Sequence, residues 1–160
     1  MERNRYMTTL SNVLAPEHVR LNLVAATSEE AIKEVAGLLR DDPDVLDWKK
    51  LYAEFRVASP CAAERGCDFG ICIPHTRTSA VRAMVISVGR FEPGLVFEGC
   101  PQLIRYVFCI GMPSALDADY LRILGLLARI LKDPDTEQEL RDAQTPSAFV
   151  STLSRLESKL

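Results

Sequence analysis

Apolar residues recur along this chain at two periods, and the shorter period marks the strands. Residues 19–25 (VRLNLVA) alternate between apolar and polar at their start, which is typical of a half-buried strand. Residues 81–91 and 102–112 are nearly continuous apolar runs, which indicates strands inside a sheet. Residues 70–74 (GICIP) predict a further short strand. The segment 92–95 (EPGL) predicts the turn between the two long strands.

Apolar residues at helical spacing mark the remaining segments. Thr27 and Glu30 have the spacing of a capping box and predict the start of the first helix, which Pro43 ends. Leu124, Leu127 and their neighbours give the strongest helical stripe of the chain. The predicted helices span residues 27–41, 44–58, 115–133, 135–144 and 145–160.

The order of these elements predicts the fold class. Strands and helices are interleaved, so we expect an α/β fold in which helices cover both faces of a sheet. The sequence contains no internal repeat and no Gly/Ser linker. We therefore expect residues 1–160 to form one domain.

Composition and charge exclude several classes of function. The 160 residues are 48% hydrophobic and 26% charged, with a net charge of -3 and no cluster of basic residues. A nucleic acid is therefore not expected as the main ligand. No apolar run approaches the ~20 residues that cross a membrane. The N-terminal segment lacks the apolar core of a secretory signal, so we expect a cytoplasmic protein without membrane insertion.

The five cysteines suggest no disulfide framework, because their number is odd and no export signal precedes them. Cys61, Cys67, Cys72 and His75 lie close together in sequence and raise the alternative of a metal site. Zinc sites usually repeat a pair of close ligands, and here there is no second pair. Strand alternation also points Cys72 away from His75, so we expect no metal. A thiol-redox role for Cys67 is a further minor alternative.

His75 is the main candidate for chemistry, in the stretch GICIPHTR at residues 70–77. In an alternating strand Ile71, Ile73 and His75 share one face. Pro74 has no N–H and interrupts regular pairing, so we expect His75 where the strand leaves the sheet. A neutral imidazole nitrogen is a competent nucleophile near pH 7 and can accept a phosphoryl group. The alternative is a surface histidine after a turn, without chemistry.

A phosphoryl group on His75 would need hydrogen-bond donors around its oxygens. Thr76 and Arg77 follow the histidine directly and offer backbone and side-chain donors. Arg65 lies in the preceding loop and offers a guanidinium group. The other histidine of the chain, His18, is expected to be solvated or structural.

The stretch GICIPHTR resembles the phosphorylation-site motif of the fructose/mannitol-type enzyme IIA domains of the bacterial phosphotransferase system, a class that includes the nitrogen-regulatory IIA proteins. The similarity continues in order through the later strands and helices. It implies a mixed central sheet with helices on both faces and a site without metal or organic cofactor. It also implies that His75 accepts phosphate from a phosphohistidine of the carrier HPr, or of a nitrogen-branch relative. His75 would then pass the group to an enzyme IIB cysteine or signal regulation.

The sequence departs from this family pattern at two places. The family usually has a second histidine on the helix after the last strand, and Tyr120 occupies the matching position here. Members also have an Arg-Glu pair sixteen residues before the phosphorylated histidine, where this chain has Ser59 and Pro60. Arg65 is a candidate substitute for the lost guanidinium. The alternative function is a catalytically silent IIA-like module that binds regulatory protein partners.

Overall fold

The computed structural model describes residues 9–58, 67–68 and 70–159, and within them the chain forms a six-stranded sheet. Strand β5 is antiparallel to β6, whereas β1 is parallel to β5, and β3 and β4 are parallel to β6. The antiparallel strand β2 completes the sheet beside β3. The strands are β1 (Val19–Leu23), β2 (Cys67–Asp68), β3 (Ile71–Cys72), β4 (His75–Arg77), β5 (Val85–Leu95) and β6 (Ile104–Met112).

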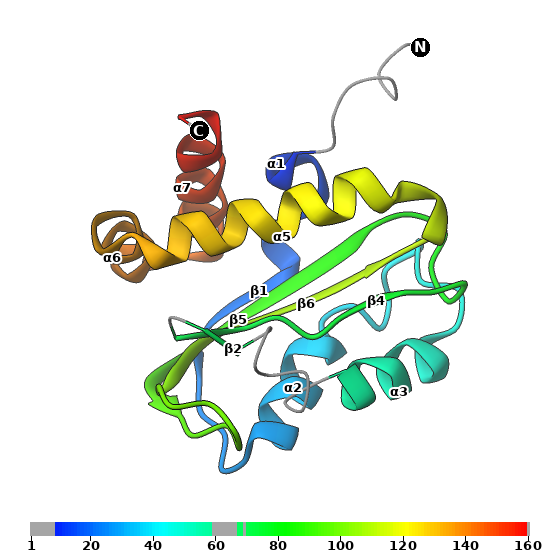
Figure 1. Ribbon diagram of the computed structural model, residues 1–160, viewed down its shortest axis with the longest axis horizontal. Coiled ribbons are helices and arrows are strands. Elements are labelled where there is room, and N and C mark those ends of the chain that lie inside the picture. The colour runs from blue at the N-terminus through cyan, green and yellow to red at the C-terminus, as the bar shows by residue number, and fades with distance from the viewer. Residues whose placement is uncertain (1–8, 59–66, 69, 160) are drawn as a thin grey trace.

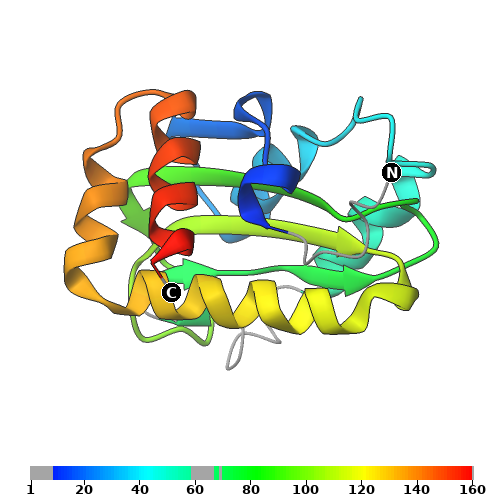
Figure 2. The same cartoon turned by 90° about the horizontal axis from the view of Figure 1, so that it is seen from above.

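Helices cover both faces of this sheet, as Figures 1 and 2 show. One face packs against α2 and α3, and the opposite face packs against α1, α5 and α7, with α6 between the last two in sequence. The expected α/β fold with a mixed central sheet is therefore confirmed. The α-helices are α1 (Leu10–Val13), α2 (Ser28–Gly37), α3 (Trp48–Ala58), α5 (Asp117–Lys132), α6 (Pro134–Asp142) and α7 (Pro146–Ser158), and two 3₁₀ turns are η2 (Pro16–His18) and η4 (Ser114–Leu116).

The start of each early helix is fixed by a local cap. The hydroxyl of Thr27 accepts the N–H of Glu30 at 3.1 Å, and the Glu30 carboxylate accepts the N–H of Ala26 at 2.6 Å. The predicted capping box therefore forms, although the carboxylate bonds one residue earlier than in the standard box. Asp47 accepts the N–H of Lys50 at 3.1 Å, so α3 begins after Asp47 rather than at residue 44.

The turn predicted at residues 92–95 is wrong. Strand β5 continues to Leu95, which pairs with Ile104, so the connection to β6 lies at residues 96–103. The pairing shifts register between Arg90 and Leu95. Such an irregularity accommodates Pro93, which has no N–H to give to the ladder.

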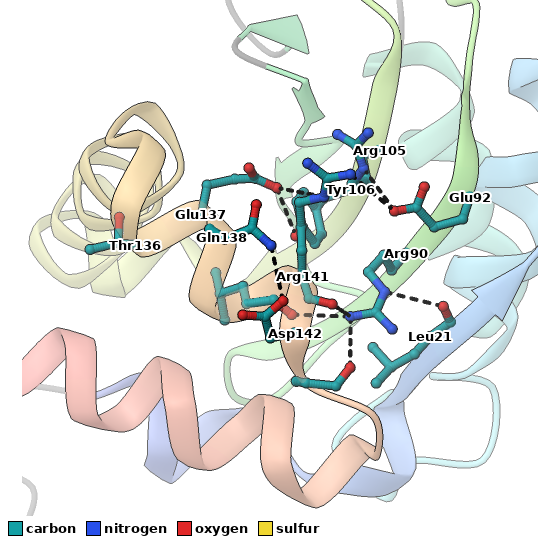
Figure 3. Close-up of polar contacts among 12 residues, drawn as sticks. Leu21, Arg90, Glu92, Arg105, Tyr106, Thr136, Glu137, Gln138, Arg141 and Asp142 are labelled. Carbon is teal, nitrogen blue, oxygen red and sulfur yellow. Dashed lines mark hydrogen bonds and ion pairs between the residues drawn. The ribbon is translucent and has the colours of Figure 1, made fainter.

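Two residues of β5 hold the helices against the sheet. Ser87 is fully buried and donates its hydroxyl hydrogen to the carbonyl of Val35 in α2 at 2.8 Å. Arg90 is 5% exposed and faces the other layer, where it donates to the carbonyls at the end of α6 (Figure 3). The sheet therefore positions α2 and α6 through polar contacts as well as apolar packing.

Candidate functional site

His75 begins strand β4, beside the central strand β6. Its register partner is Ile110, and β3 and β4 both lie parallel to β6 with only Ile73 and Pro74 between them. The carbonyl of Pro74 still accepts the N–H of Ile110 at 3.0 Å. Proline lacks a donor but keeps its acceptor, so the chain stays in the sheet. The sequence suggested that His75 lies where a strand leaves the sheet. This expectation is wrong, because His75 is still paired with β6.

The faces of this segment alternate as predicted. Ile71 and Ile73 belong to the core under α5 and α7, whereas Cys72 belongs to the core under α2 and α3. His75 follows the isoleucines, because its ring contacts Tyr120 of α5. Thr76 faces the other way and donates its hydroxyl hydrogen to Glu54 of α3 at 3.3 Å.

The imidazole of His75 is held by a backbone carbonyl two residues earlier in the chain. Its Nδ1 lies 2.5 Å from the carbonyl oxygen of Ile73, and a carbonyl oxygen can only accept a hydrogen bond. Nδ1 therefore carries the proton, and in the neutral ring the lone pair is on Nε2. The side chain is half-buried, and its lone pair makes Nε2 the ring nitrogen able to act as a nucleophile.

Tyr120 lies against the histidine. It is the fourth residue of α5 and only 7% exposed, and its ring centroid is 5.6 Å from that of His75 with the planes tilted by 50°. Burial raises the pKa of Tyr120 to about 12, although the charge of Arg77 acts in the opposite direction. The hydroxyl therefore keeps its proton at neutral pH and can donate one hydrogen bond.

Arg77 brings a positive charge to the same group. Its guanidinium carbon Cζ lies 5.9 Å from the ring centroid of Tyr120, which is within the range of a cation–π contact. His75 and Arg77 are two residues apart in β4 and therefore point to the same face. We call His75, Arg77 and Tyr120 the His75 cluster.

Thr76, another candidate phosphate-binding residue, is not brought into this cluster. The Thr76 hydroxyl bonds to Glu54 on the opposite face of the sheet. Ser59 and Arg65 lie outside the described residues, and their roles stay predictions. Sequence reasoning missed Glu54, because nothing in the second predicted helix signals a partner 22 residues away.

The metal alternative does not combine Cys72 with His75, because the two side chains face different cores. In the described part of the chain, no three His, Cys, Asp or Glu side chains are grouped so that they could hold a metal ion. Cys61 lies outside that part. Cys67 is the register partner of Cys72 across β2 and β3, and its proposed redox role stays untested.

The chain has the fold of solved enzyme IIA proteins. It matches the nitrogen regulatory protein IIA-Ntr from Neisseria meningitidis with a TM-score of 0.77 and 18% identity, over 90% of this chain and 98% of that one. It matches the mannitol IIA of Escherichia coli, in a complex with phosphorylated enzyme IIB, with a TM-score of 0.67 and 17% identity, over 89% and 97% of the two chains.

The sequence defines the family. A family model described as the phosphoenolpyruvate-dependent sugar phosphotransferase system, EIIA 2, matches residues 12–156, and the chain belongs to this family. It is 28% identical to the fructose-specific EIIA component of Haloferax volcanii, over 94% of this chain and 97% of that protein. It is 25% identical to a nitrogen regulatory protein of Pseudomonas aeruginosa, over 89% and 93%. The chain therefore has the phosphocarrier or regulatory role of this family.

Within the described residues, each helix is too short or too polar to cross a membrane.

Proposed function

We propose that this chain is a phosphoryl carrier of the phosphoenolpyruvate-dependent phosphotransferase system and that Nε2 of His75 accepts the phosphoryl group. The observation that carries this proposal is the contact between His75 Nδ1 and the carbonyl of Ile73, which leaves Nε2 unprotonated in the neutral ring. The phosphate donor is a phosphohistidine of HPr or of a nitrogen-branch relative of HPr. The site works without a metal or an organic cofactor.

The transfer exchanges one phosphorus–nitrogen bond for another. The Nε2 lone pair of His75 attacks phosphorus, and the bond between phosphorus and the donor imidazole breaks. The donor ring leaves with that electron pair. His75 then carries the phosphoryl group on Nε2 and the proton on Nδ1, and its positive charge is stabilised by the Ile73 carbonyl. No separate general base is needed, because the attacking nitrogen carries no proton.

Arg77 and Tyr120 serve the phosphoryl oxygens in place of the family's second histidine. The family helper can carry a charge and donate a hydrogen bond. Here these two tasks are divided, because Arg77 supplies the charge and the protonated Tyr120 hydroxyl supplies a donor. Pro74 and Thr78 turn their backbone groups toward β6, so strand alternation turns the N–H groups of His75 and Arg77 away from β6. Those amides add possible donors at the strand edge.

Two outputs are open to the phosphorylated chain. It passes the group to a cysteine thiolate of an enzyme IIB, and the solved mannitol complex with phosphorylated IIB supports this route. The kinship with nitrogen regulatory proteins supports the other output, in which the charge on His75 controls binding to a regulatory target. For either output, we propose a protein that consists of one domain and acts in the cytoplasm.

The test is phosphotransfer to the full chain. The protein is incubated with labelled phosphoenolpyruvate, enzyme I and either HPr or its nitrogen-branch relative, and acid-labile label on the chain is measured. The sequence has two histidines, so His18 provides a matched control. We expect His75→Ala to abolish the label and His18→Gln to keep it, because His18 lies beside Asp42 at the end of η2, away from the His75 cluster.

Absence of label with both carriers would contradict the proposal. It would favour the second candidate, a catalytically silent IIA-like module that binds regulatory partners. The uncharged Tyr120 at the position of the second histidine is the observation that favours this candidate. Label that persists in His75→Ala would place the phosphoryl group on another residue.

A further inference from the structure

A second candidate site lies beside α5, on the side that faces α1 and α7. A cavity of about 440 Å³ opens between α5, the short helix α1 and the C-terminal part of α7. Figure 2 shows these three elements from above, with the end of α7 approaching α5. Small-molecule sites in proteins typically have volumes of roughly 300–1,000 Å³, and this cavity falls in that range.

Two arginines of α5 line the cavity. Arg122 and Arg129 are seven residues apart, which is about two helical turns, so both lie on one side of α5. Leu126 lies between them and is 5% exposed, which gives the cavity an apolar floor. The positive charges and the floor together fit an anion attached to a carbon body.

Glu157 of α7 also lines the cavity, and its carboxylate is hydrogen-bonded to α1. Both of its carboxylate oxygens accept the backbone N–H of Leu10, at 3.0 and 3.1 Å. Its Oε2 is 3.9 Å from Nη1 of Arg122, which is too long for a hydrogen bond. The lining therefore carries two guanidinium groups and one carboxylate, and the carboxylate of Asp119 lies beside Arg122 outside the lining.

Arg122 is the least satisfied residue of this lining. Its Nε and Nη2 are buried and have no hydrogen-bond partner among the described residues. Nη2 is 3.9 Å from Oδ1 of Asp119, again beyond hydrogen-bond distance. Buried donors without partners are costly, and a guanidinium edge matches the paired oxygens of a phosphate. A turn of this side chain toward the cavity would give both donors an acceptor.

We propose that this cavity binds a small organic phosphate that carries hydroxyl groups. The phosphate lies between Arg122 and Arg129, and the carbon body covers Leu126. The ligand's hydroxyl groups meet Glu157 and the side chains of Ser11 and Ser154, which also line the cavity. Two arginines favour a phosphate dianion over a single carboxylate. This site is independent of phosphorylation at His75 and does not rest on the proposed function.

The test is an NMR titration of the ¹⁵N-labelled full chain. Glucose 6-phosphate is the probe, and glucose and sodium phosphate are added in parallel. We expect saturable shifts of the amides of residues 122–129 and 154–158 with glucose 6-phosphate, and at least tenfold weaker binding of the other two. Arg129→Gln is expected to weaken binding at least tenfold. Lys33→Gln removes a charge from α2 on the opposite face and should change binding less than twofold (Figure 1).

Four outcomes would overturn all or part of the proposal. The first is the absence of saturable shifts, and the second is an unchanged affinity in Arg129→Gln, which alters an exposed side chain and should fold normally. The third is a set of shifts centred on residues 75–77 and 120, which would show that the phosphate binds at the His75 cluster. Equal affinity for sodium phosphate would contradict the role of the hydroxyl groups. A His75→Ala variant should retain binding even if it cannot be phosphorylated.

Discussion

The two ends of the central sheet each hold an arginine and a tyrosine, and the surroundings of the two pairs differ. At one end, Arg90 is buried and donates to the carbonyls of Leu140, Arg141 and Ala143 at 2.8–3.0 Å and to that of Leu21 at 3.3 Å (Figure 3). At the other end, the Arg77 side chain is exposed and lies over the Tyr120 ring. Arg90 therefore holds the end of α6 against the sheet, whereas Arg77 belongs to the same cluster as the candidate nucleophile His75.

The two tyrosines differ in the same way. Tyr106 donates its hydroxyl hydrogen to Glu137 at 3.1 Å, and burial together with this carboxylate raises its pKa. Burial also raises the pKa of Tyr120, and arginine charges oppose the shift at both tyrosines. The difference lies in the contacts: Tyr106 joins β6 to α6 through Glu137, whereas Tyr120 lies against the ring of His75. The comparison predicts that substitutions at one end affect stability and those at the other affect phosphotransfer.

The largest effect is expected for Arg90→Met. This change leaves carbonyls of α6 and β1 without their donor, and we expect a loss of about 3 kcal/mol in the free energy of unfolding. For a chain of this size, that corresponds to a fall of about 6–12 °C in Tm. Urea unfolding followed by circular dichroism measures the change in the free energy of unfolding.

Arg155→Met is the matched control for this substitution. Arg155 pairs with Glu139 at the surface, so its loss should cost less than about 1 kcal/mol. Folded Arg90→Met protein should still accept phosphate at His75. Equal stability of the two variants would show that the Arg90 contacts contribute nothing beyond an exposed ion pair.

Arg77→Gln is expected to have the next largest effect, on rate rather than stability. Removing the charge beside the phosphoryl group should slow transfer from phosphorylated HPr about tenfold, which is ~1.4 kcal/mol of activation free energy. Single-turnover labelling measures the rate. Arg20→Gln is the control, because Arg20 is exposed on β1, at the edge of the sheet away from β4. Equal rates for both variants would remove Arg77 from the site.

Local sequence patterns predicted the face of His75, the candidate nucleophile, correctly. Alternation in a strand depends on neighbouring residues only, so Ile71, Ile73 and His75 could be assigned to one side without knowledge of the fold. The same holds for the helix cap at Thr27, whose partner is three residues away. The turn after β5 was misplaced, because Pro93 and Gly94 read as a turn whereas pairing with β6 decides where the strand ends.

Contacts between distant segments could not be predicted in this way. Three of the carbonyls that bind Arg90 come from residues 50 to 53 positions later and the fourth from Leu21, 69 positions earlier, so the sequence VISVGRF shows only a charge in an apolar strand. The position of Arg77 over Tyr120 likewise depends on how α5 crosses β4. Family resemblance pointed to Tyr120, and the structure supplied its contact with His75.

A smaller effect is expected on the pH dependence of stability. The folded pKa of Tyr120 is raised above the value of 10 for an ordinary tyrosine, so the folded state favours the protonated phenol. This contribution is complete below pH 10 and is lost as the pH rises toward 12. Tyr120→Phe should therefore lose less stability than the wild type between pH 10 and 12. Urea midpoints at pH 8, 10 and 11 measure this difference, and parallel curves would contradict it.

The smallest effect is expected for Thr76→Val, although Thr76 directly follows the nucleophile. Its hydroxyl bonds to Glu54 on the face opposite to the imidazole, and valine keeps the strand propensity and the backbone N–H. We expect the rate of phosphotransfer to change less than twofold in the single-turnover assay used for Arg77→Gln. A tenfold loss would mean that the hydroxyl leaves Glu54 and binds the phosphoryl group. The sheet would then supply donors to the site from both of its faces, and the division between the two ends would be less sharp than this structure indicates.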